Sequence, residues 1–540
     1  MEVNTALFSD SAMRSAEGSH GSHGSTYQPA SEAFAAQLNM SRRPAVPLSM
    51  QSMDIMTETE GLLLHGGTGD FPCSTAEDLD RFPAFGAPLE EVMSAPLWKR
   101  LLWDGGGSPF DVFLTAASAQ VGQVLLNLPN SMARLGLVGG ILTQTFCAAT
   151  AVYTLCLLQS LYHEVKRMQV KSGTWFSAGT FKRDHVTQYH SVIHDTMGSR
   201  WYAEFTRVVN VLELIGLAAA QIISSASNLY YAQPVGHRIW NKRDFTLLSG
   251  GIASCFVFVP LFRHMRVFVF IALFGSSYVA YYMIAESIQH GFPNAAATAA
   301  AQPTEFLDIF QAVSNILFTF GGHAMLIEVL DGQFRPSKFR GMFGWALVYV
   351  TAFLTLPSAS LVYLSFPEEA YNTGNAFKIF PPDAAMVFGV AIMMLHQMIA
   401  YGLFMLPVFH IAEKALGVHE KGSYFAKVAA RLLPAFVVWL ITLMFPFFGV
   451  INDLIGSFCT PFETYITPCL AFTIYYWSKA RRENPVDTYP GFSFGSLFIV
   501  NGVVIAAATI CGLGFGGYAS VVELATSVKD FGLFAPCYQC

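Results

Sequence analysis

Residues 315–330, NILFTFGGHAMLIEVL, are mostly apolar, yet they contain two glycines and a histidine, which poorly suit an unbroken membrane helix. Gly321 and Gly322 let the backbone unwind, and unwinding exposes polar N–H and C=O groups to a ligand. His323 follows them directly, and histidine is the side chain suited to gaining and losing a proton between about pH 5 and 8. The stretch therefore predicts a ligand-binding and proton-binding point inside a membrane. The alternatives are close helix packing at the glycines and a structural hydrogen bond from the histidine.

A second interrupted segment reads SAQVGQVLLNLPNSMARLG. Gly122 and Pro129 interrupt it, and Gln120, Gln123 and Asn127 add amides. It is the first long apolar segment, and residues 315–330 belong to the sixth. Breaks in a first and a sixth helix are typical of transporters built from two inverted five-helix repeats, whose broken helices meet near the membrane midplane. Half-helix N-termini at such a point suit an anion, and freed carbonyl groups suit a cation.

We expect the substrate site to draw on both breaks and on the third apolar segment. Two side chains are candidates for carrying a proton. These are His323 and Glu213, because ionisable residues inside a membrane helix are costly and usually functional; Glu213 could equally face a water-filled cavity with a structural partner. For Glu328 and Asp331, an exposed helix end is favoured over an ion pair at a gate. For His396, a bridge between helices is favoured over a role at the site of the coupled ion. The expected substrate-binding residues are Gln120, Gln123, Val124, Leu126, Asn127, Gln221, Asn315, Thr319, Phe320, Gly321, Gly322 and His323.

The elements that must position these residues are long apolar helices. Only 13% of the 540 residues are charged and 53% are hydrophobic, which indicates a polytopic membrane protein. A helix needs about 20 apolar residues to cross the hydrocarbon core. Eleven segments meet this requirement: 111–133, 137–161, 205–231, 245–262, 267–285, 306–330, 341–365, 383–411, 432–449, 455–477 and 493–520. Loop charge sets their direction, because lysine and arginine favour the cytoplasmic side. The loops on one side carry Lys166, Arg167, Arg335, Lys338 and Arg340, whereas 286–305, on the other side, has neither residue type.

The chain divides into three parts. Residues 1–100 include the low-complexity stretch GSHGSHGSTYQPASEAF and read as a disordered cytoplasmic tail. Residues 101–525 form the transmembrane domain, and 526–540 form an extracellular tail. That tail ends in CYQC, and Cys537 and Cys540 could form a disulfide or remain two free thiols.

Several segments resemble one known family. NILFTFGGHAMLIEVL, QVLLNLPNSMARLG, ASNLYY, LPSASLVY, HQMIAYG, FPFFGVIN, GLGFGGYAS and DFGLFAPCYQC are similar to matching segments of the plant auxin influx carriers (AUX/LAX), a branch of the amino acid/auxin permeases. The likeness covers about residues 100 to 540. It implies an all-α, LeuT-like fold of eleven transmembrane helices, with two inverted five-helix repeats and broken helices 1 and 6.

The resemblance also implies a function. The family imports indole-3-acetic acid together with protons across the plasma membrane, from an acidic exterior. Three residues depart from the family pattern, which has asparagine where this chain has Ala119, an apolar residue at Glu213, and threonine at Glu463. These differences leave open a proton-coupled permease for neutral or aromatic amino acids, because a carboxylate could accept the ammonium group.

Other classes are disfavoured. A binding-only sensor would carry a long folded cytoplasmic domain. The sequence has no HExxH zinc motif, so we expect neither an enzyme nor a metal site or cofactor, and no catalytic residue is assigned. No basic stripe indicates a nucleic-acid partner. The expected partners are indole-3-acetic acid or a related aromatic carboxylate, protons and the lipid bilayer.

Overall fold

The computed structural model describes residues 74–80 and 107–538, apart from 173–185, 235–237, 260–264, 302–304, 334, 420–421, 448, 490 and 537. Most of the predicted tail 1–100, together with Cys537 and Cys540, lies outside the described residues. Within the described part, every regular element is a helix. Those of the first half are α3 (Ala76–Leu79), α6 (Pro109–Val121), η2 (Gln123–Leu126), α7 (Leu128–Lys171), α9 (Tyr189–Met197), α10 (Arg200–Tyr231), α11 (Lys242–Ser254), η3 (Cys255–Phe258), α12 (Arg266–His290) and α13 (Ala295–Ala300). Those of the second half are α14 (Phe306–Thr319), α15 (His323–Asp331), η5 (Pro336–Lys338), α16 (Phe339–Val348), η6 (Tyr349–Thr355), α17 (Leu356–Ser365), α18 (Pro367–Asn372), η7 (Ala376–Lys378), α19 (Ala384–Ala415), α20 (Tyr424–Met444), α21 (Val450–Phe458), η8 (Pro461–Ile466), α22 (Thr467–Tyr475), α23 (Lys479–Glu483), α24 (Phe494–Ala507), η9 (Ala508–Gly516) and α25 (Gly517–Phe531).

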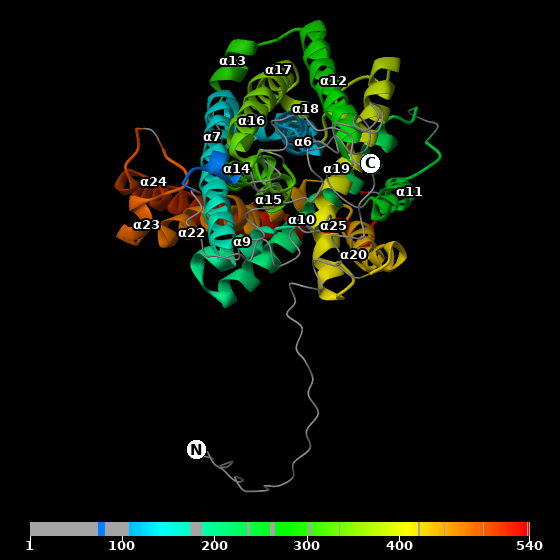
Figure 1. Ribbon diagram of the computed structural model, residues 1–540. Helices are drawn as coiled ribbons and strands as arrows, with labels where there is room; N and C mark the ends of the chain where they lie inside the picture. Colours follow the sequence, from blue (N-terminus) through cyan, green and yellow to red (C-terminus); the bar gives the residue numbers. More distant parts are fainter. Residues whose placement is uncertain are drawn as a thin grey trace, which may run out of the picture. The chain divides into compact units, whose positions relative to one another are not determined.

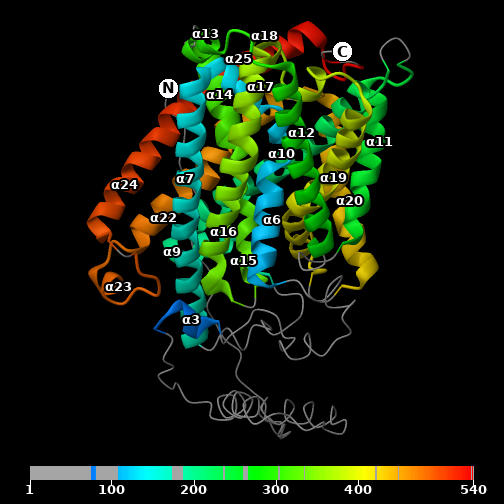
Figure 2. The ribbon, with the colours of Figure 1, turned by 90° about the horizontal axis from the view of Figure 1, so that it is seen from above.

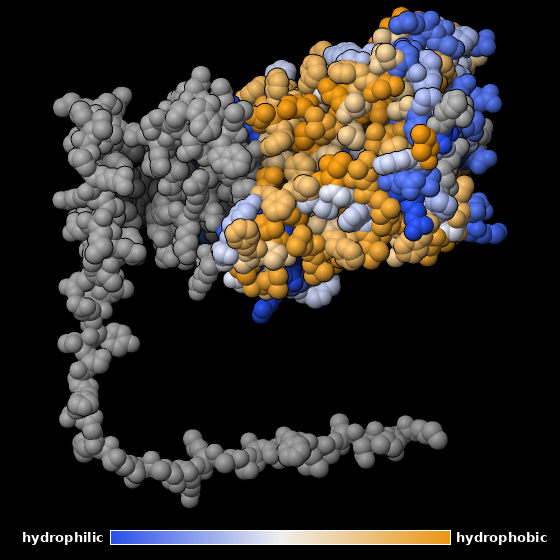
Figure 3. All heavy atoms as spheres, turned by 90° about the vertical axis from the view of Figure 1, so that its right-hand side faces the viewer, coloured by the Kyte–Doolittle hydropathy of each residue, from blue (hydrophilic) through white to orange (hydrophobic). Residues whose placement is uncertain are grey.

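Eight helical stretches of the described chain are long and apolar enough to cross a membrane. They are Leu128–Lys171, Arg200–Tyr231, Arg266–His290, Phe306–Asp331, Pro336–Ser365, Ala384–Ala415, Tyr424–Met444 and Phe494–Phe531. Large apolar side chains such as Leu142, Phe274 and Leu433 are exposed on the outside of the bundle. Figure 3 shows apolar side chains over much of one face, with hydrophilic ones gathered at one end. This chain is therefore a multi-pass membrane protein.

The long helices run side by side, and short elements gather at the two ends of the bundle (Figures 1 and 2). Helices α9 and α23 lie at one end, as Figure 2 shows, and α13 and α18 lie at the other. The first end carries the basic loops of the sequence prediction, and the second carries the segment 286–305, which has no lysine or arginine. The two kinds of loop are thus on opposite sides of the bundle.

The first helix is interrupted where the sequence places its glycine. Helix α6 begins in a capping box between Ser108 and Asp111 and ends at Gly122. The short 3₁₀ segment η2 follows, and α7 starts after Asn127. The sixth helix is interrupted between α14 and α15, where Gly322 has a φ of 97°, a conformation that residues with a Cβ rarely adopt. Both predicted breaks are therefore present.

One predicted boundary lies inside a continuous element. The sequence separates spans 111–133 and 137–161. Helix α7, from Leu128 to Lys171, includes the end of the first span and all of the second. Gly136, with a φ of 71° and a ψ of 163°, turns the chain at the predicted boundary. The backbone therefore leaves the helical conformation between the two predicted spans. The seventh, tenth and eleventh predicted spans each contain a π-helical stretch, η6, η8 and η9, respectively.

Candidate functional site

The two breaks meet through side-chain amides. Gln120 Nε2 donates to the Gly321 carbonyl at 2.7 Å, which joins the end of α6 to the break before α15. Asn127 Nδ2 donates to Asn315 Oδ1 at 3.0 Å, which joins the start of α7 to α14. Both bonds are buried, so water does not compete for them. Hence the interrupted parts of two helices far apart in sequence form one polar centre.

A small cavity of about 10 Å³ lies at this centre. Its lining includes six residues of the predicted substrate site, namely Gln120, Gln123, Val124, Gln221, Thr319 and Gly321. Leu217, in the third predicted span, also lines it and is not among the predicted site residues. The cavity is also lined by Ala119, Gly122, Phe318 and Phe404. The other predicted site residues, Leu126, Asn127, Asn315, Phe320, Gly322 and His323, are buried around the cavity rather than among its lining residues. In this conformation the cavity is too small to hold an indole carboxylate.

Three polar atoms around the cavity have no hydrogen-bond partner within the described chain. They are Gln120 Oε1, Gln221 Oε1 and His396 Nε2. The other ring nitrogen of His396 lies 2.7 Å from the Ala272 carbonyl, so it bridges helices as the sequence predicts. A Cβ built on Gly122 would lie 3.1 Å from His396 Nε2, which places that free nitrogen at the first break. Buried polar atoms without partners indicate a place where a polar ligand can bind.

His323 is fully buried and faces α7. Its Nε2 lies 3.1 Å from the Ala151 carbonyl and 3.2 Å from Thr154 Oγ1. Its Nδ1 has no partner among the described residues. In this conformation the ring bridges α15 and α7, which is the structural alternative that the sequence left open.

Glu213 approaches the second break from α10. Its Oε1 accepts a hydrogen bond from Thr460 at 2.9 Å, and a Cβ built on Gly321 would lie 2.9 Å from the same oxygen. Gly321 is therefore required for close approach as well as for unwinding. The Glu213 side chain is fully buried and lies against the backbone that the substrate site is expected to use.

A second polar cavity, of about 60 Å³, lies between the start of α7, α14, α18, α21 and α25. Asn127, Asn315 and Arg134 line one part of it, and Asp453 and Glu523 line another. Arg134 contacts Gln311 and forms an ion pair with Asp308 at 3.3 Å. This cavity adjoins both breaks, because Asn127 and Asn315, which join the two interrupted helices, are among its lining residues.

The C-terminal end of α15, away from the break, makes buried polar contacts with neighbouring elements. Glu328 Oε2 lies 2.8 Å from His410 Nδ1, and Gln188 Nε2 donates to Glu328 Oε1 at 2.8 Å. Asp331 accepts hydrogen bonds from Tyr162 and from the Thr187 N–H, both at 2.8 Å. The prediction of an exposed helix end was wrong, because α9 and α19 cover these carboxylates. The contacts close this end of the molecule.

His190, on α9, gives the closed end a pH dependence that can be measured. Burial, with the nearby positive charges of Lys414 and Arg207, lowers the pKa of His190 to about 4. The unfolded chain binds this proton near pH 6.5, so stability falls as the pH drops from about 6.5 towards 4. We expect His190→Gln to reduce the loss of thermal stability between about pH 7 and about pH 5, measured as Tm. His194→Gln, at an exposed position of α9, controls for loss of an imidazole; an unchanged pH dependence in His190→Gln would contradict the assignment.

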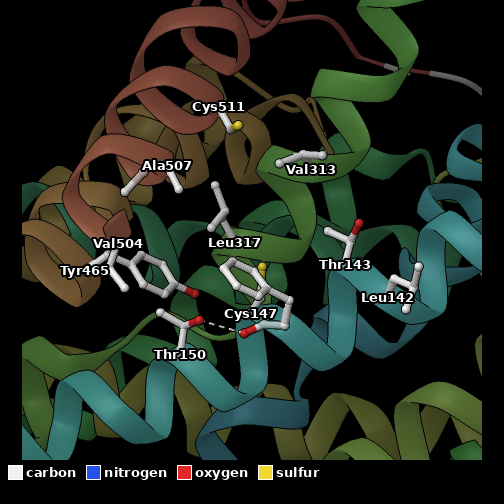
Figure 4. A pocket seen from close by; sticks show the side chains of 12 residues that line it. Leu142, Thr143, Cys147, Thr150, Val313, Leu317, Tyr465, Val504, Ala507 and Cys511 are labelled. Carbon is white, nitrogen blue, oxygen red and sulfur yellow. Dashed lines mark hydrogen bonds between the residues drawn. The ribbon is translucent and has the colours of Figure 1, made fainter. Parts of the chain in front are cut away.

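An apolar groove of about 330 Å³ lies between α7, α14 and α24 (Figure 4). Leu142, Cys147, Leu317 and Val504 are among its lining residues, and Tyr465 contributes a hydroxyl. None of its lining residues is charged. Because Leu142 is 64% exposed, the groove continues the apolar outer surface. We therefore place the functional site at the polar centre rather than in this larger space.

Comparison with known proteins identifies the family. Residues 105–514 match the model of the family described as "Transmembrane amino acid transporter protein". The chain is 36% identical over 441 residues to "Auxin transporter protein 1" of Arabidopsis thaliana, covering 81% of this chain and 88% of that protein. It is 35% identical over 445 residues to "Auxin transporter-like protein 1" of Medicago truncatula, covering 82% and 90%. It is 36% identical over 442 residues to "Auxin transporter-like protein 3" of Oryza sativa subsp. japonica, covering 82% and 78%.

This chain belongs to the transmembrane amino acid transporter family, in the branch of the auxin transporters. The family match includes both breaks and every residue of the predicted site. The protein is a membrane transporter for a small molecule and not an enzyme. In the transporter, the polar centre has the position expected for a substrate, since it joins two interrupted helices inside the bundle.

Proposed function

We propose that this transporter imports auxin, indole-3-acetic acid, together with protons across the plasma membrane. The meeting of the two broken helices, joined by Gln120 and Gly321 around a small polar cavity, carries the proposal. The indole ring would pack against Phe318 and Phe404, and its carboxylate would approach the freed N–H groups at the break. The relatives named as auxin transporters favour this substrate.

The proposed architecture has eleven transmembrane helices in two inverted five-helix repeats. Its N-terminus is cytoplasmic and its C-terminus is extracellular, as the loop charges predict. The proposed transport domain is 101–525, preceded by the cytoplasmic segment 1–100 and followed by the extracellular tail 526–540. The closed end around Glu328 and His410 is then the cytoplasmic gate, and the polar cavity beside Arg134 is the outer approach.

Two residues are proposed to couple transport to protons. His323 would hold a proton in the outward-facing state and release it inside, and Glu213 would act beside it at the same break. The remaining substrate-binding residues are those predicted from the sequence, with Gln120, Gln221 and Thr319 at the cavity wall. Uptake of substrate and proton together would be symport.

The second candidate function is a proton-coupled permease for neutral or aromatic amino acids. The buried carboxyl group of Glu213 favours it, because an ammonium group needs an anionic or carbonyl partner. Competition separates the two candidates. Excess tryptophan would reduce the uptake of labelled indole-3-acetic acid if the site accepts amino acids, and would leave it unchanged in an auxin carrier.

The testing experiment is uptake of labelled indole-3-acetic acid into cells that express the chain, at about pH 5.5 and about pH 7.5. We expect saturable uptake at the lower pH. We expect His323→Ala to lower this uptake at least about tenfold, which corresponds to about 1.4 kcal/mol, because the variant lacks the proposed proton carrier. His194→Ala, at an exposed site, is the control for surface expression. Undiminished uptake by His323→Ala would show that His323 is structural, and no uptake at either pH would exclude auxin as the substrate.

A further inference from the structure

A second buried carboxyl group lies beside Glu213. Glu463, on η8, is 1% exposed, and Glu213, on α10, is fully buried. The two carboxyl groups are neighbours, because Thr460, whose hydroxyl donates to Glu213, stands at the start of the helical stretch η8 that carries Glu463. A carboxylate can only accept a hydrogen bond, so a bond between two carboxyl groups requires a proton on one of them.

The remaining contacts of the two groups locate that proton. Thr460 Oγ1 donates to Glu213 Oε1 at 2.9 Å, and Thr464 Oγ1 donates to Glu463 Oε2 at 3.0 Å. Glu213 Oε2 and Glu463 Oε1 are buried and accept no hydrogen bond from another group of the described chain. Each carboxyl group thus has one oxygen bonded to a threonine and one oxygen left for its neighbour. The shared proton belongs between these two free oxygens.

The pair also lies at the N-terminus of α15, where the backbone N–H groups of Gly322 and His323 open the helix. A Cβ built on Gly321, the preceding residue, would lie 2.9 Å from Glu213 Oε1. These N–H groups begin a nine-residue helix, and helix N-termini stabilise negative charge. The chain's own carboxyl groups therefore lie beside donors that an anionic substrate would use at this break.

The surroundings supply no fixed positive charge. Neither carboxyl group has an arginine or lysine partner among the described residues. The titratable groups that face the pair are Tyr189 on α9, Cys459 after α21 and Tyr465 on η8. His323 begins α15 beside the pair, and its ring is turned towards α7. Tyr189 donates to the main-chain carbonyl of Glu463 at 2.8 Å, which holds η8 in place. Two unpaired negative charges in such a site would repel each other strongly, whereas one shared proton leaves a single charge on the helix N-terminus.

We propose that Glu213 and Glu463 form one proton site, which holds a shared proton and, on binding a second proton, releases the N-terminus of α15 to a substrate carboxylate. The coupling step rests on the proposed auxin import; the shared proton does not. The second proton neutralises the pair, so its hold on the Gly322 and His323 N–H groups weakens. Loss of that proton restores the cap and expels the anion. Substrate and proton then bind and leave together.

The shared proton is tested without any substrate, by infrared spectroscopy of the purified full-length protein near neutral pH. Subtracting the spectrum of Glu463→Gln or Glu213→Gln from that of the wild type is expected to leave the C=O stretching band of a protonated carboxylic acid in both cases. Subtraction also removes the contribution of Asp453 and Glu523, a second pair of acids in contact. Glu204→Gln, on the exposed side of α10, is the matched control and should leave no band. Absence of the band, or its presence for only one of the two variants, would overturn the shared site.

The coupling is tested by the KM of auxin uptake at about pH 5.5 and about pH 7.5. An ordinary carboxylic acid is mostly ionised at both values, so ionisation of the substrate contributes little. We expect the wild-type KM to rise about tenfold at the higher pH and that of the Gln variants to change less than about twofold, a difference of about 1 kcal/mol. Variants with the wild-type pH dependence would overturn the coupling. Should the Gln variant at 463 fail to fold, Glu463→Thr serves in both measurements. If the wild type shows the infrared band but imports no auxin, the shared proton stands and the proposed function fails.

Discussion

Arg431→Met is expected to lower the stability of the folded transporter by about 3–5 kcal/mol, because it leaves a buried carboxylate without its cation. Arg431 Nε donates to Glu413 Oε1 at 2.5 Å, and its Nη1 donates to the carbonyls of Val257 and Val259 at 2.9 and 2.7 Å. The side chains of Arg431 and Glu413 are 3% and 1% exposed. After the substitution, Glu413 keeps the contact of its Oε2 with His419 Nδ1 at 2.7 Å. The measurement is the Tm of the purified protein in detergent.

A double variant identifies the cause. Replacing both members of a buried ion pair by apolar residues is often close to neutral, so Arg431→Met with Glu413→Leu should recover part of the lost stability. Lys479→Met removes the cation from an exposed pair with Glu483, whose N and O atoms are 3.8 Å apart, and should change stability by less than about 1 kcal/mol. A double variant no more stable than Arg431→Met would contradict the explanation by buried charge.

Gly456→Ala is expected to destabilise the protein by about 1–3 kcal/mol or more, because it forces two helix backbones apart. A Cβ at this position of α21 would lie less than 3.0 Å from the Ser314 carbonyl oxygen of α14. It would also lie 2.9 Å from the Phe318 Cβ. Neither atom belongs to the end of a flexible side chain, so α14 must shift. The result is a lower Tm and reduced uptake, since α14 carries Asn315 and Thr319 to the polar centre.

The matched control is Gly341→Ala on α16. A Cβ there would meet no atom within 4 Å, and alanine favours a helix over glycine by up to about 1 kcal/mol. Its stability should therefore be unchanged or higher. Equal Tm values for the two variants would show that α14 and α21 can separate without cost.

The positions of the helix breaks could be read from the sequence because they depend on local properties. Gly122 and the pair Gly321-Gly322 interrupt long apolar segments, and the backbone departs from a helix at both places. The same local information gave the apolar segments, the membrane class and six of the residues that line the central cavity. The resemblance of the segments around residues 120 and 320 gave the family, which the comparisons confirm.

The partners of the buried polar groups were decided by the tertiary structure. Sequence showed that Glu463 departs from the family pattern, but only folding brings η8 against α10 and joins it to Glu213. The sequence left open whether His323 also makes a structural hydrogen bond, and the packing of α15 on α7 places its Nε2 3.1 Å from the Ala151 carbonyl. Glu328 was expected at an exposed helix end, and α19 covers it with His410. Periodicity specifies which residues are inside a bundle, because burial is a property of each helix face. It does not specify which groups meet there, because that depends on how distant helices pack.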